Sequence, residues 1–445
     1  MKPYPKYKES GVEWIGKIPE RWELKPLKHA LKEIISGGTP NTSNSLYWSD
    51  NEEGIPWVAI SDISDSNGIL NHTSKKISMQ GLKEKGLSII PKGTLLISIF
   101  ASLGKSTILE IDATVNQAIL GLIPSSELKR DFLKHYLINI ERNIGYYSSS
   151  NTQENLNLSK IRSLPIALPS VPEQDLILKF LNTTTNQIDE AVDKKQHLIS
   201  LLEEEKKAII NHAVTKGLDS KAPMKDSGVE WLGKIPKYWD VKRLKYVAIV
   251  QPSNVDKKSF DDETEVFLCN YVDVYKNELI SSKIDFMKAT ANKDEINKFL
   301  IKKGNVLITK DSEEPTDIAV PALVTENFEK VLCGYHLSQM IPNESQLLGA
   351  YLFELFRSKR FNTQFIVAAC GVTRFSIGSY DVTNAYISLP PIKEQQQIVN
   401  HIQSETTKIN QTINKIQREI ELLQEYRTAL ISEAVTGKID VRGLA

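Results

Sequence analysis

The sequence has few cysteines and no long apolar run. Its three cysteines, Cys269, Cys333 and Cys370, are odd in number and show no Cys-x-x-Cys spacing. Such a set argues against a disulfide framework or a cysteine zinc site, and it favours a reducing compartment. No apolar stretch is long enough to cross a bilayer, and the polar start MKPYPKYKES lacks the apolar core of a signal peptide. We therefore expect a cytoplasmic chain without a membrane segment.

An excess of positive charge is also missing. The chain has 55 Lys and Arg residues against 55 Asp and Glu residues, so its formal net charge is zero. A protein that binds DNA by itself usually carries a basic surface that neutralises phosphates. Any contact with DNA must therefore come from local patches, or a partner must supply many of the phosphate contacts.

Motifs for nucleotide binding and methyl transfer are incomplete. SLGKST (102–107) resembles the end of a phosphate-binding loop, but Ile99 stands where the first glycine is required. LPPI (389–392) resembles the (Asn/Asp)-Pro-Pro-aromatic motif of amino-methyltransferases, but Leu389 and Ile392 replace its polar and aromatic residues. We therefore expect no cofactor. A single-chain methyltransferase or nuclease stays as the alternative, and binding of S-adenosylmethionine to the isolated chain would support it.

Metal and nuclease chemistry also lack a constellation. The seven histidines are scattered, and none lies at a metal-ligand spacing from another histidine or a carboxylate. The acids that follow Lys310, which are Asp311, Glu313 and Glu314, have no counterpart in the first half, and we interpret them as a solvated loop. The sequence predicts a chain with no catalytic residues and no metal site.

An internal repeat organises the chain. SGVEWIGKIPERW (10–22) returns as SGVEWLGKIPKYW (227–239), and AIINHAVTKGLD (208–219) returns as ALISEAVTGKID (429–440). The segments between these repeats have diverged. Because both copies keep two tryptophans around an Ile-Pro pair, we expect an irregular arm with the tryptophans as packing anchors. The chain is a duplicated unit with two different inserts.

A long helix is predicted after each insert. The first extends over about 172–215, with Pro172 and Glu173 in its first turn, and the second follows Pro391. Apolar residues step by three and four along both, with polar interruptions in the seams. The predicted helix–helix interface consists of Ile188, Val192, Ile199, Leu202, Ile209, Ile409, Ile413, Ile416, Ile420, Leu423 and Leu430. An antiparallel pair within the chain is the simplest way to bury both seams, and a homodimeric coiled coil is the alternative.

The inserts mix strand and helix patterns without regular alternation, which favours an α+β class. Residues 55–63, 93–100 and 106–111 are predicted strands, and 132–144 is a predicted helix. The second insert keeps this skeleton but has different loops, as expected for two binding specificities on one scaffold. Polar and basic loop residues able to contact bases or phosphates are the candidate DNA-binding residues. They are Asn41, Ser43, Tyr47, Ser102, Lys105, Asn151, Gln153, Asn155, Lys310, Arg357, Lys359, Arg360, Thr373 and Arg374.

Four features together resemble one family over the whole chain. They are the doubled anchor, the GGTP…YW…IPW motif, GVTRFSIGSYDV before LPPIKEQQQI, and the two long helices. The chain is similar to the specificity subunit of type I restriction–modification systems. The resemblance implies two globular target recognition domains, each reading one half of a split site in double-stranded DNA. It also implies that two antiparallel helices separate them with pseudo-twofold symmetry.

The resemblance further implies partners and domain limits. Two modification (methyltransferase) subunits and the restriction (helicase–nuclease) subunits would carry the chemistry. The expected domains are an arm with the first target recognition domain (1–165), the first helix (166–222), the second arm and domain (223–390), and the second helix with a tail (391–445). An interaction scaffold, or a DNA-binding protein without restriction partners, remains the alternative function.

Overall fold

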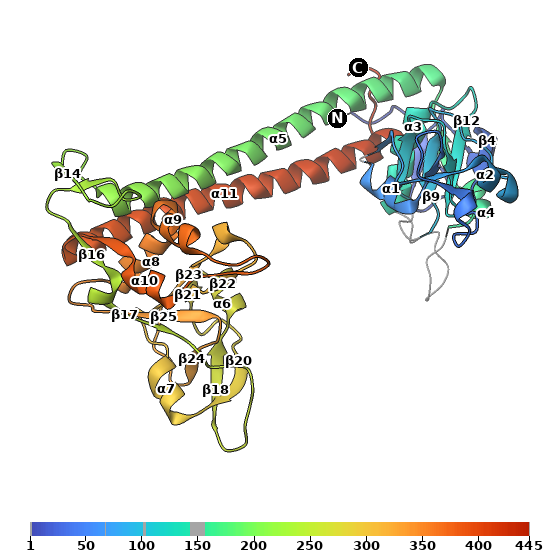
Figure 1. Ribbon diagram of the computed structural model, residues 1–445. Coiled ribbons are helices and arrows are strands. Elements are labelled where there is room, and N and C mark those ends of the chain that lie inside the picture. Colours follow the sequence, from blue (N-terminus) through green and yellow to red (C-terminus); the bar gives the residue numbers. More distant parts are fainter. Residues whose placement is uncertain (1, 67, 101–103, 143–155, 445) are drawn as a thin grey trace. The chain divides into compact units, whose positions relative to one another are not determined.

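The computed structural model consists of two compact units. The structure describes residues 2–66, 68–100, 104–142 and 156–444. Unit 1 comprises Met1–Lys194 and Arg418–Ala445, and unit 2 comprises Lys195–Gln417 (Figure 1). The predicted α+β class is confirmed, since each unit combines mixed sheets with helices. Within the described residues, no helix is both long and apolar enough to cross a membrane.

Both predicted long helices are present. Helix α5 extends over Val171–Lys216 and α11 over Ile392–Val435. Each has a glutamate in its first turn, Glu173 in α5 and Glu394 in α11, where a negative charge interacts favourably with the helix dipole. Each unit contains a part of both helices, because the division between the units passes through α5 and α11.

The two helices pair in antiparallel fashion within each unit. In unit 1 Arg427 of α11 donates two hydrogen bonds to Asp189 of α5, of 2.8 and 3.2 Å. In unit 2 Lys206 of α5 donates a 3.1 Å hydrogen bond to Asn410 of α11. The register is the same in both units, since 206 − 189 and 427 − 410 both equal 17. Lys206 and Arg427 are the polar interruptions in the two seams, and each therefore meets a polar partner on the other helix.

The apolar seam residues lie on the protected side of each helix. Ile188, Val192, Ile409, Ile416, Ile420 and Leu430 are buried. Ile199, Leu202, Ile209, Ile413 and Leu423 are half-buried. The two helices of one chain thus cover each other's apolar positions inside each unit.

Each unit contains the same five-stranded sheet. In unit 1 the strand order is β4-β12-β9-β10-β7, and in unit 2 it is β17-β25-β21-β23-β19. The last pair is parallel and the others are antiparallel in both sheets. The strands of unit 1 are β4 (Leu31–Ser36), β12 (Ile119–Pro124), β9 (Leu95–Ser98), β10 (Ser106–Leu109) and β7 (Ile69–Leu70). Those of unit 2 are β17 (Ala248–Pro252), β25 (Leu337–Pro342), β21 (Val306–Thr309), β23 (Pro321–Val324) and β19 (Leu279–Ile280).

A second, smaller sheet is also repeated. Its common core is one antiparallel and one parallel pair, β8-β6-β11 in unit 1 and β20-β18-β24 in unit 2. The strands are β6 (Ile55–Val58), β8 (Lys75–Ile77), β11 (Thr114–Val115), β18 (Thr264–Cys269), β20 (Met287–Ala291) and β24 (Val331–Cys333), with β5 (Trp48–Ser49) added in unit 1. Cys269 and Cys333 are buried free thiols and Cys370 is an exposed one, so the expectation of no disulfide is confirmed.

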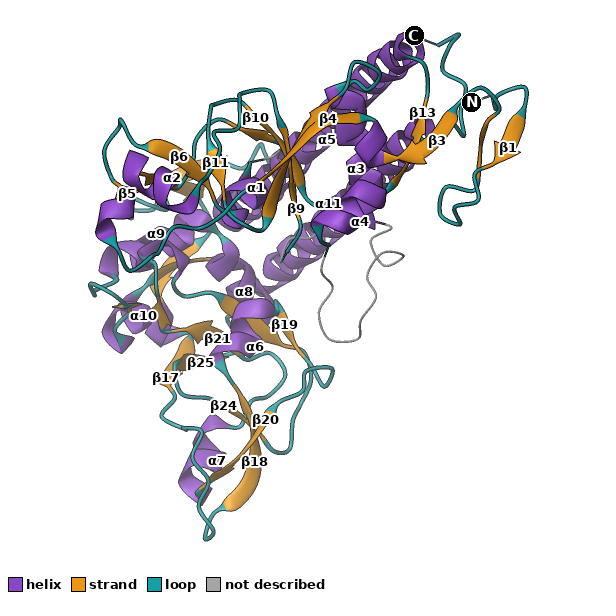
Figure 2. Cartoon of the chain, turned by 90° about the vertical axis from the view of Figure 1, so that its right-hand side faces the viewer, coloured by secondary structure: helices purple, strands orange, loops and turns teal. Residues whose placement is uncertain are grey.

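Both inserts also contain short helices (Figure 2). Unit 1 has α1 (Ile60–Asp65), α2 (Met79–Lys85), α3 (Arg130–Arg142) and α4 (Leu158–Ser163). Unit 2 has α6 (Tyr271–Lys276), α7 (Lys293–Phe299), α8 (Gly349–Arg357), α9 (Lys359–Ala368) and α10 (Ser379–Asn384). The predicted helix over 132–144 is confirmed by α3. The strand predicted over 55–63 is too long: it ends at Val58, because the Asp62 carboxylate accepts the amide of Ala59 at 2.8 Å and starts α1.

The repeated anchors form short hairpins rather than the irregular arm that the sequence predicted. They pair β1 (Tyr7–Glu9) with β2 (Lys17–Pro19), and β14 (Met224–Asp226) with β15 (Lys234–Pro236). Next in the chain, β3 (Glu23–Pro26) pairs with β13 (Pro165–Leu168), and β16 (Asp240–Arg243) with β27 (Tyr386–Leu389). Trp22 and Trp239 are each at most 1% exposed, which confirms their expected role as packing anchors.

A buried glutamine attaches each long helix to its domain. Gln174 of α5 donates to the carbonyls of Glu127 and Pro169 and accepts the amide of Lys129, at 2.7–3.0 Å. Gln395 of α11 makes the matching set with Gln346, Pro390 and Leu348, at 2.8–2.9 Å.. Because both glutamines are 0% exposed, these bonds replace water for three main-chain groups in each unit. The repeat therefore fixes how each insert sits on its own helix.

Candidate nucleic-acid interface

Polar loops gather at one edge of the five-stranded sheet in unit 2. The chain leaves β17 after Pro252, leaves β21 after Thr309 and enters β25 at Leu337. Because these neighbours are antiparallel, all three points lie at the same edge. The loops beyond them are joined by main-chain hydrogen bonds, such as Lys310 to His336 at 2.9 Å. The edge therefore presents several side chains on a firm base.

Lys310 is held against this edge. Its ammonium donates to the carbonyl of Ser253 at 3.1 Å and lies 5.2 Å from the ring centre of Tyr335. Burial lowers the pKa of Lys310, although the nearby Asp311 carboxylate acts in the opposite direction. The predicted DNA-binding lysine is thus half-buried and already has partners within the protein.

Asp311 joins two other loops to this edge. Its carboxylate hydrogen-bonds Nδ1 of His336 and lies 3.7 Å from Nη2 of Arg374. The Asp311 side chain is only 18% exposed, whereas that of Arg374 is 56% exposed. The expectation that the acids after Lys310 form a solvated loop is therefore wrong for Asp311.

A cavity of about 430 Å³ opens beside these residues. Tyr271 and Tyr275 on one wall stack with ring centres 5.6 Å apart, and Tyr275 donates to Asp317 at 2.7 Å. The remaining lining residues include Ser312, Glu313 and Thr373, besides Asp311 and Arg374. Thr373 and Arg374, both predicted from the sequence, thus lie together at a hollow with several carboxylate acceptors and two aromatic rings.

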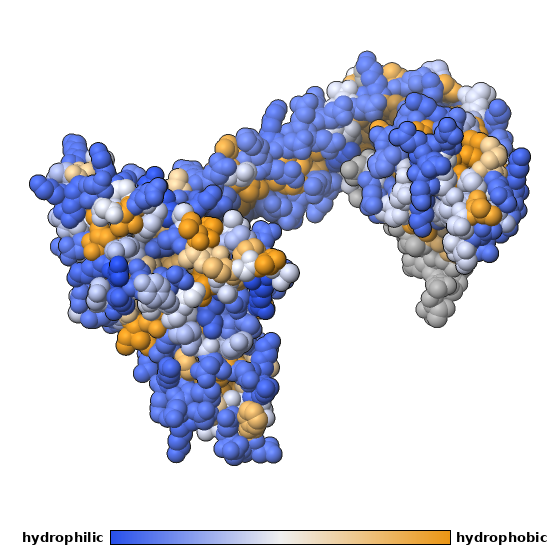
Figure 3. All heavy atoms as spheres, viewed as in Figure 1, coloured by the Kyte–Doolittle hydropathy of each residue, from blue (hydrophilic) through white to orange (hydrophobic). Residues whose placement is uncertain are grey.

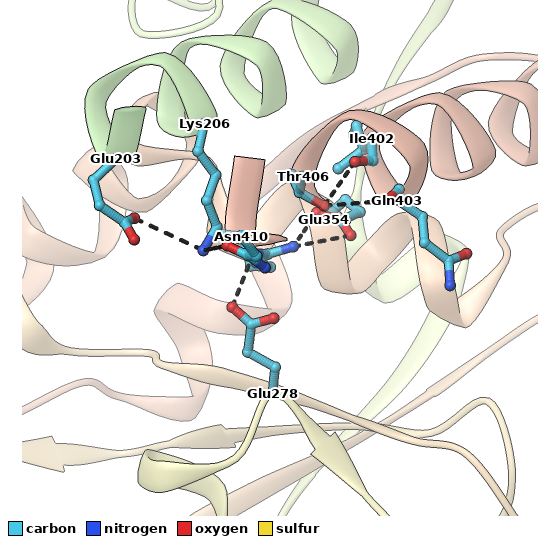
Figure 4. Close-up of polar contacts among 9 residues, drawn as sticks. Glu203, Lys206, Glu278, Glu354, Ile402, Gln403, Thr406 and Asn410 are labelled. Atoms are coloured by element: carbon cyan, nitrogen blue, oxygen red, sulfur yellow. Dashed lines mark hydrogen bonds and ion pairs between the residues drawn. The ribbon is translucent and has the colours of Figure 1, made fainter. Parts of the chain in front are cut away.

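Arg357 lies elsewhere and has a structural role. Its guanidinium contacts Glu354 at 3.0 Å and Glu278 at 2.9 Å, and its side chain is 13% exposed. In Figure 4, Glu278 lies below Lys206 of α5 and Asn410 of α11, and Glu354 lies to the side of Asn410. Arg357, predicted as a DNA-binding residue, is thus paired with two carboxylates, and little of its side chain reaches water.

Lys359 and Arg360 are exposed at the start of α9. The amide of Arg360 donates to the Asn211 side chain of α5 at 3.3 Å. Its charge, with that of Lys234, adds to burial in lowering the pKa of Lys216. The two residues therefore belong to a basic group beside α5, and not to the loops that carry Thr373 and Arg374.

In unit 1 the equivalent edge has other side chains. Asn41 accepts the amide of Ser43 at 3.0 Å, and its own carbonyl accepts Nε1 of Trp48 at 3.2 Å. Asn41 and Ser43 are exposed and Tyr47 is half-buried. Trp48 packs edge-on against Trp57, at 5.1 Å between ring centres. The loop over 37–48 thus brings three predicted residues to one tryptophan-supported surface.

Five further predicted residues belong to the first half. Lys105 is exposed, and its carbonyl accepts the amide of Ser98 at 2.9 Å, at the end of β9. Gln117, which the sequence did not single out, bonds Thr39 on the neighbouring loop. Outside the described residues lie Ser102, Asn151, Gln153 and Asn155.

Strand register identifies which residues of the two edges are equivalent. Ile119 pairs with Ser98 in unit 1 as Leu337 pairs with Thr309 in unit 2. Ile99 and Phe100 therefore occupy the places of Lys310 and Asp311, and Gln117 and Ala118 those of Tyr335 and His336. The equivalent backbone bonds are present, from Ile99 to Ala118 at 2.8 Å and from Lys310 to His336 at 2.9 Å. The backbone is retained while the exposed chemistry differs.

Two copies of one fold with different loop chemistry match a known family. Residues 19–199 and 236–422 fit the model of the type I restriction modification DNA specificity domain. The chain belongs to this family. The resemblance predicted from the anchors, inserts and helices is confirmed, and with it the role in DNA sequence specificity.

Relatives match along almost the whole specificity protein. The chain is 27% identical to the type I restriction enzyme MjaIX specificity subunit of Methanocaldococcus jannaschii, covering 97% of this chain and 96% of that one. It is 20% identical to the EcoBI specificity subunit of Escherichia coli, covering 97% and 89%.

Solved structures share the fold. One, from a study of complex assembly and conformational transition in a type I R-M system, has a TM-score of 0.68 at 14% identity, covering 95% of this chain and 99% of that one. The HsdS subunit from Thermoanaerobacter tengcongensis has a TM-score of 0.56 at 16% identity, covering 95% and 98%. At these low sequence identities, the likeness shows a shared fold and nothing more.

Several residues at these edges were missed by sequence reasoning. Asp311 and His336 are 25 residues apart, and only the strand pairing brings them together. Tyr271 and Tyr275 share one face of α6, where the spacing of four is a usable signal for a stacked pair. The internal alignment of the two halves also offered a signal, because it pairs Asp311 with Phe100.

Proposed function

We propose that this specificity protein reads a bipartite target in double-stranded DNA, with one sheet edge of each unit contacting one half-site. The observation that carries the proposal is the pair of equivalent edges, whose backbone is the same and whose side chains differ. A retained scaffold with changed loops is how one fold acquires two specificities. The candidate residues for unit 1 are Asn41, Ser43, Tyr47 and Lys105, and those for unit 2 are Thr373 and Arg374.

The chemistry belongs to partner subunits in this proposal. Two modification subunits would transfer methyl groups and restriction subunits would cleave, all directed by the site that this chain recognises. The balanced net charge agrees with shared DNA binding, because partners then supply part of the phosphate contacts. In Figure 3 the visible faces of both units are mostly hydrophilic, with separate apolar patches on each. The chain itself needs no cofactor, and the complex would act in the cytoplasm, where its DNA lies.

Methylation of a random DNA library tests the proposal. The chain is combined with its modification subunit and S-adenosylmethionine, and the methylated sequences are read. We expect two short specified segments separated by an unspecified spacer of fixed length. Lys105→Ala should alter one segment only. Methylation without sequence preference, or a complex that ignores DNA and retains another protein, would favour the scaffold alternative instead.

A further inference from the structure

Among the described residues, one cluster at the edge of unit 2 has no counterpart at the equivalent edge of unit 1. Asp311 and His336 occupy the positions of Phe100 and Ala118 in the matched strand register. Both units nevertheless form the same sheet, so the fold does not require this cluster. Because the scaffold forms without this polar cluster in unit 1, the cluster is a candidate for recognition that is specific to unit 2.

Arg374 stands on a rigid hairpin. Cys370 and Ser376 exchange two main-chain hydrogen bonds of 2.9 and 3.1 Å, and Ser376 pairs with Asp311 across β22 (Asp311–Ser312) and β26 (Phe375–Ser376). Gly371 has a φ of 151°, which a side chain at this position would strain. Val372 at the tip is 93% exposed. The hairpin therefore projects into solvent from a base that Asp311 itself helps to form.

The contacts of Arg374 restrain its guanidinium without covering it. Asp311 lies 3.7 Å from Nη2, and the side chain remains 56% exposed. Asp311 is held in turn by His336, whose own backbone has the uncommon φ of 60° and whose ring packs against Tyr335 at 4.3 Å. Strained residues of this kind concentrate at functional sites. An arginine fixed in this way loses less freedom on binding than one that is unrestrained.

The surroundings of Arg374 favour a base edge over a phosphate. Asp311, Glu313 and Asp317 line the same hollow, and their carboxylates would repel a phosphate group. Base edges in the major groove are neutral, and a guanidinium fork matches O6 and N7 of guanine with two hydrogen bonds. The carboxylates themselves can accept hydrogen bonds from the amino groups of bases.

We propose that Arg374 recognises a guanine in the major groove of the half-site read by unit 2, and that Asp311 and His336 are positioning residues for its guanidinium. The proposal rests on the proposed function and adds the base and the residues that select it. Asp311 acts by restraining the fork of Arg374, and His336 acts by restraining Asp311.

The test uses the full chain with its modification subunit and the random DNA library. We expect one half-site to contain a G·C pair, and Arg374→Ala to reduce discrimination at that pair by about 10- to 100-fold while the other half-site is unchanged. Arg374→Lys should relax the same pair, since a lysine has no planar fork. Asp311→Asn and His336→Ala should relax it partially, with the rest of the motif retained. Lys293→Ala, on an exposed part of α7, is the control and should leave the motif intact.

The outcomes separate this proposal from the proposed function. If the wild-type chain selects a bipartite site but Arg374→Ala weakens methylation of all sequences equally, Arg374 is a phosphate contact and the inference is overturned. The same holds if no G·C pair depends on Arg374. If the wild-type chain selects no bipartite site, the proposed function fails and the inference with it. Thermal melting of the Arg374 variants should match the wild type, because the side chain is exposed.

Discussion

Glu354 illustrates at the residue scale how this protein places a charge in its interior. Its side chain is 8% exposed, and burial raises its pKa to about 7 although Arg357 opposes the shift. The nearby Glu278 carboxylate raises it further, and Lys206 lowers it. The network couples the insert of unit 2 to the helix pair through charged groups, which are costly to bury unless they are paired.

This raised pKa predicts a pH dependence. An acid whose pKa is higher in the folded state binds more protons after folding, so the free energy of unfolding falls as pH rises from about 4.5 to 7. Glu354→Gln cannot ionise and keeps a hydrogen-bond acceptor for Arg357. The difference in the free energy of unfolding, variant minus wild type, should therefore grow by about 1–3 kcal/mol between pH 5 and 8. Urea unfolding at several pH values measures this, and a difference that is constant with pH would contradict the raised pKa.

At the level of the elements, a buried glutamine near the start of each long helix hydrogen-bonds main-chain groups of the adjoining insert. Gln174 and Gln395 stand at equivalent places and bond equivalent carbonyls and amides. The apolar seams place the helices against each other, and these bonds orient the insert of each unit on its helix. Apolar packing alone is non-directional and would not select one orientation.

Removing one glutamine should therefore destabilise its unit strongly. Gln395→Ala leaves two carbonyls and one amide without their partner, at an expected loss of about 2–4 kcal/mol. Gln396→Ala is the matched control. The side chain of Gln396 is exposed and hydrogen-bonds Asn400, so its removal should change the free energy of unfolding by no more than about 0.5 kcal/mol. Urea midpoints of the two variants give the comparison. Equal effects would mean that water replaces the lost bonds of Gln395.

At the scale of the whole molecule, the helices join the two proposed reading domains along the chain. Two linked binding sites cooperate only if the spacing of their targets matches the link. The sequence repeat equates Leu202 with Leu423, but the antiparallel register gives Leu202 another facing residue. Leu202 precedes Lys206 by four, so it faces Asn414, which follows Asn410 by four.

Lengthening the helix pair should lengthen the spacer of the DNA target. Seven residues inserted near Leu202 and seven near Asn414 keep the apolar seams in phase. They add about 10 Å at 1.5 Å per residue, or about three base pairs at 3.4 Å each. Methylation mapping should show unchanged half-sites with a longer spacer. An insertion in α5 alone, which breaks the register, should abolish selection of the site, and an unchanged spacer in the double variant would refute the helices as its determinant.

The frame of this specificity protein could be predicted from the amino-acid sequence. Local periodicity and self-similarity reveal the repeat, the two long helices and the different inserts. Both patterns can be recognised in the sequence without knowing any tertiary contact. The strand over 55–63 was overextended because one side-chain cap at Asp62 decided where the helix starts. Thr373 and Arg374 were predicted as candidates because their residue types suit base recognition.

Which charged side chains are exposed depends on contacts that form only in the folded chain. Arg357 and Arg374 are the same residue type in polar surroundings, yet one is neutralised in a buried network and the other projects from a hairpin. Glu278, one of the two partners of Arg357, and Asp311, the partner of Arg374, are distant from them in sequence. Pairing between remote segments depends on strand register and on the packing of the inserts, and no local pattern encodes either. The sequence could therefore predict polar loops on each insert, but only the fold shows which of their side chains are exposed and which are paired within the protein.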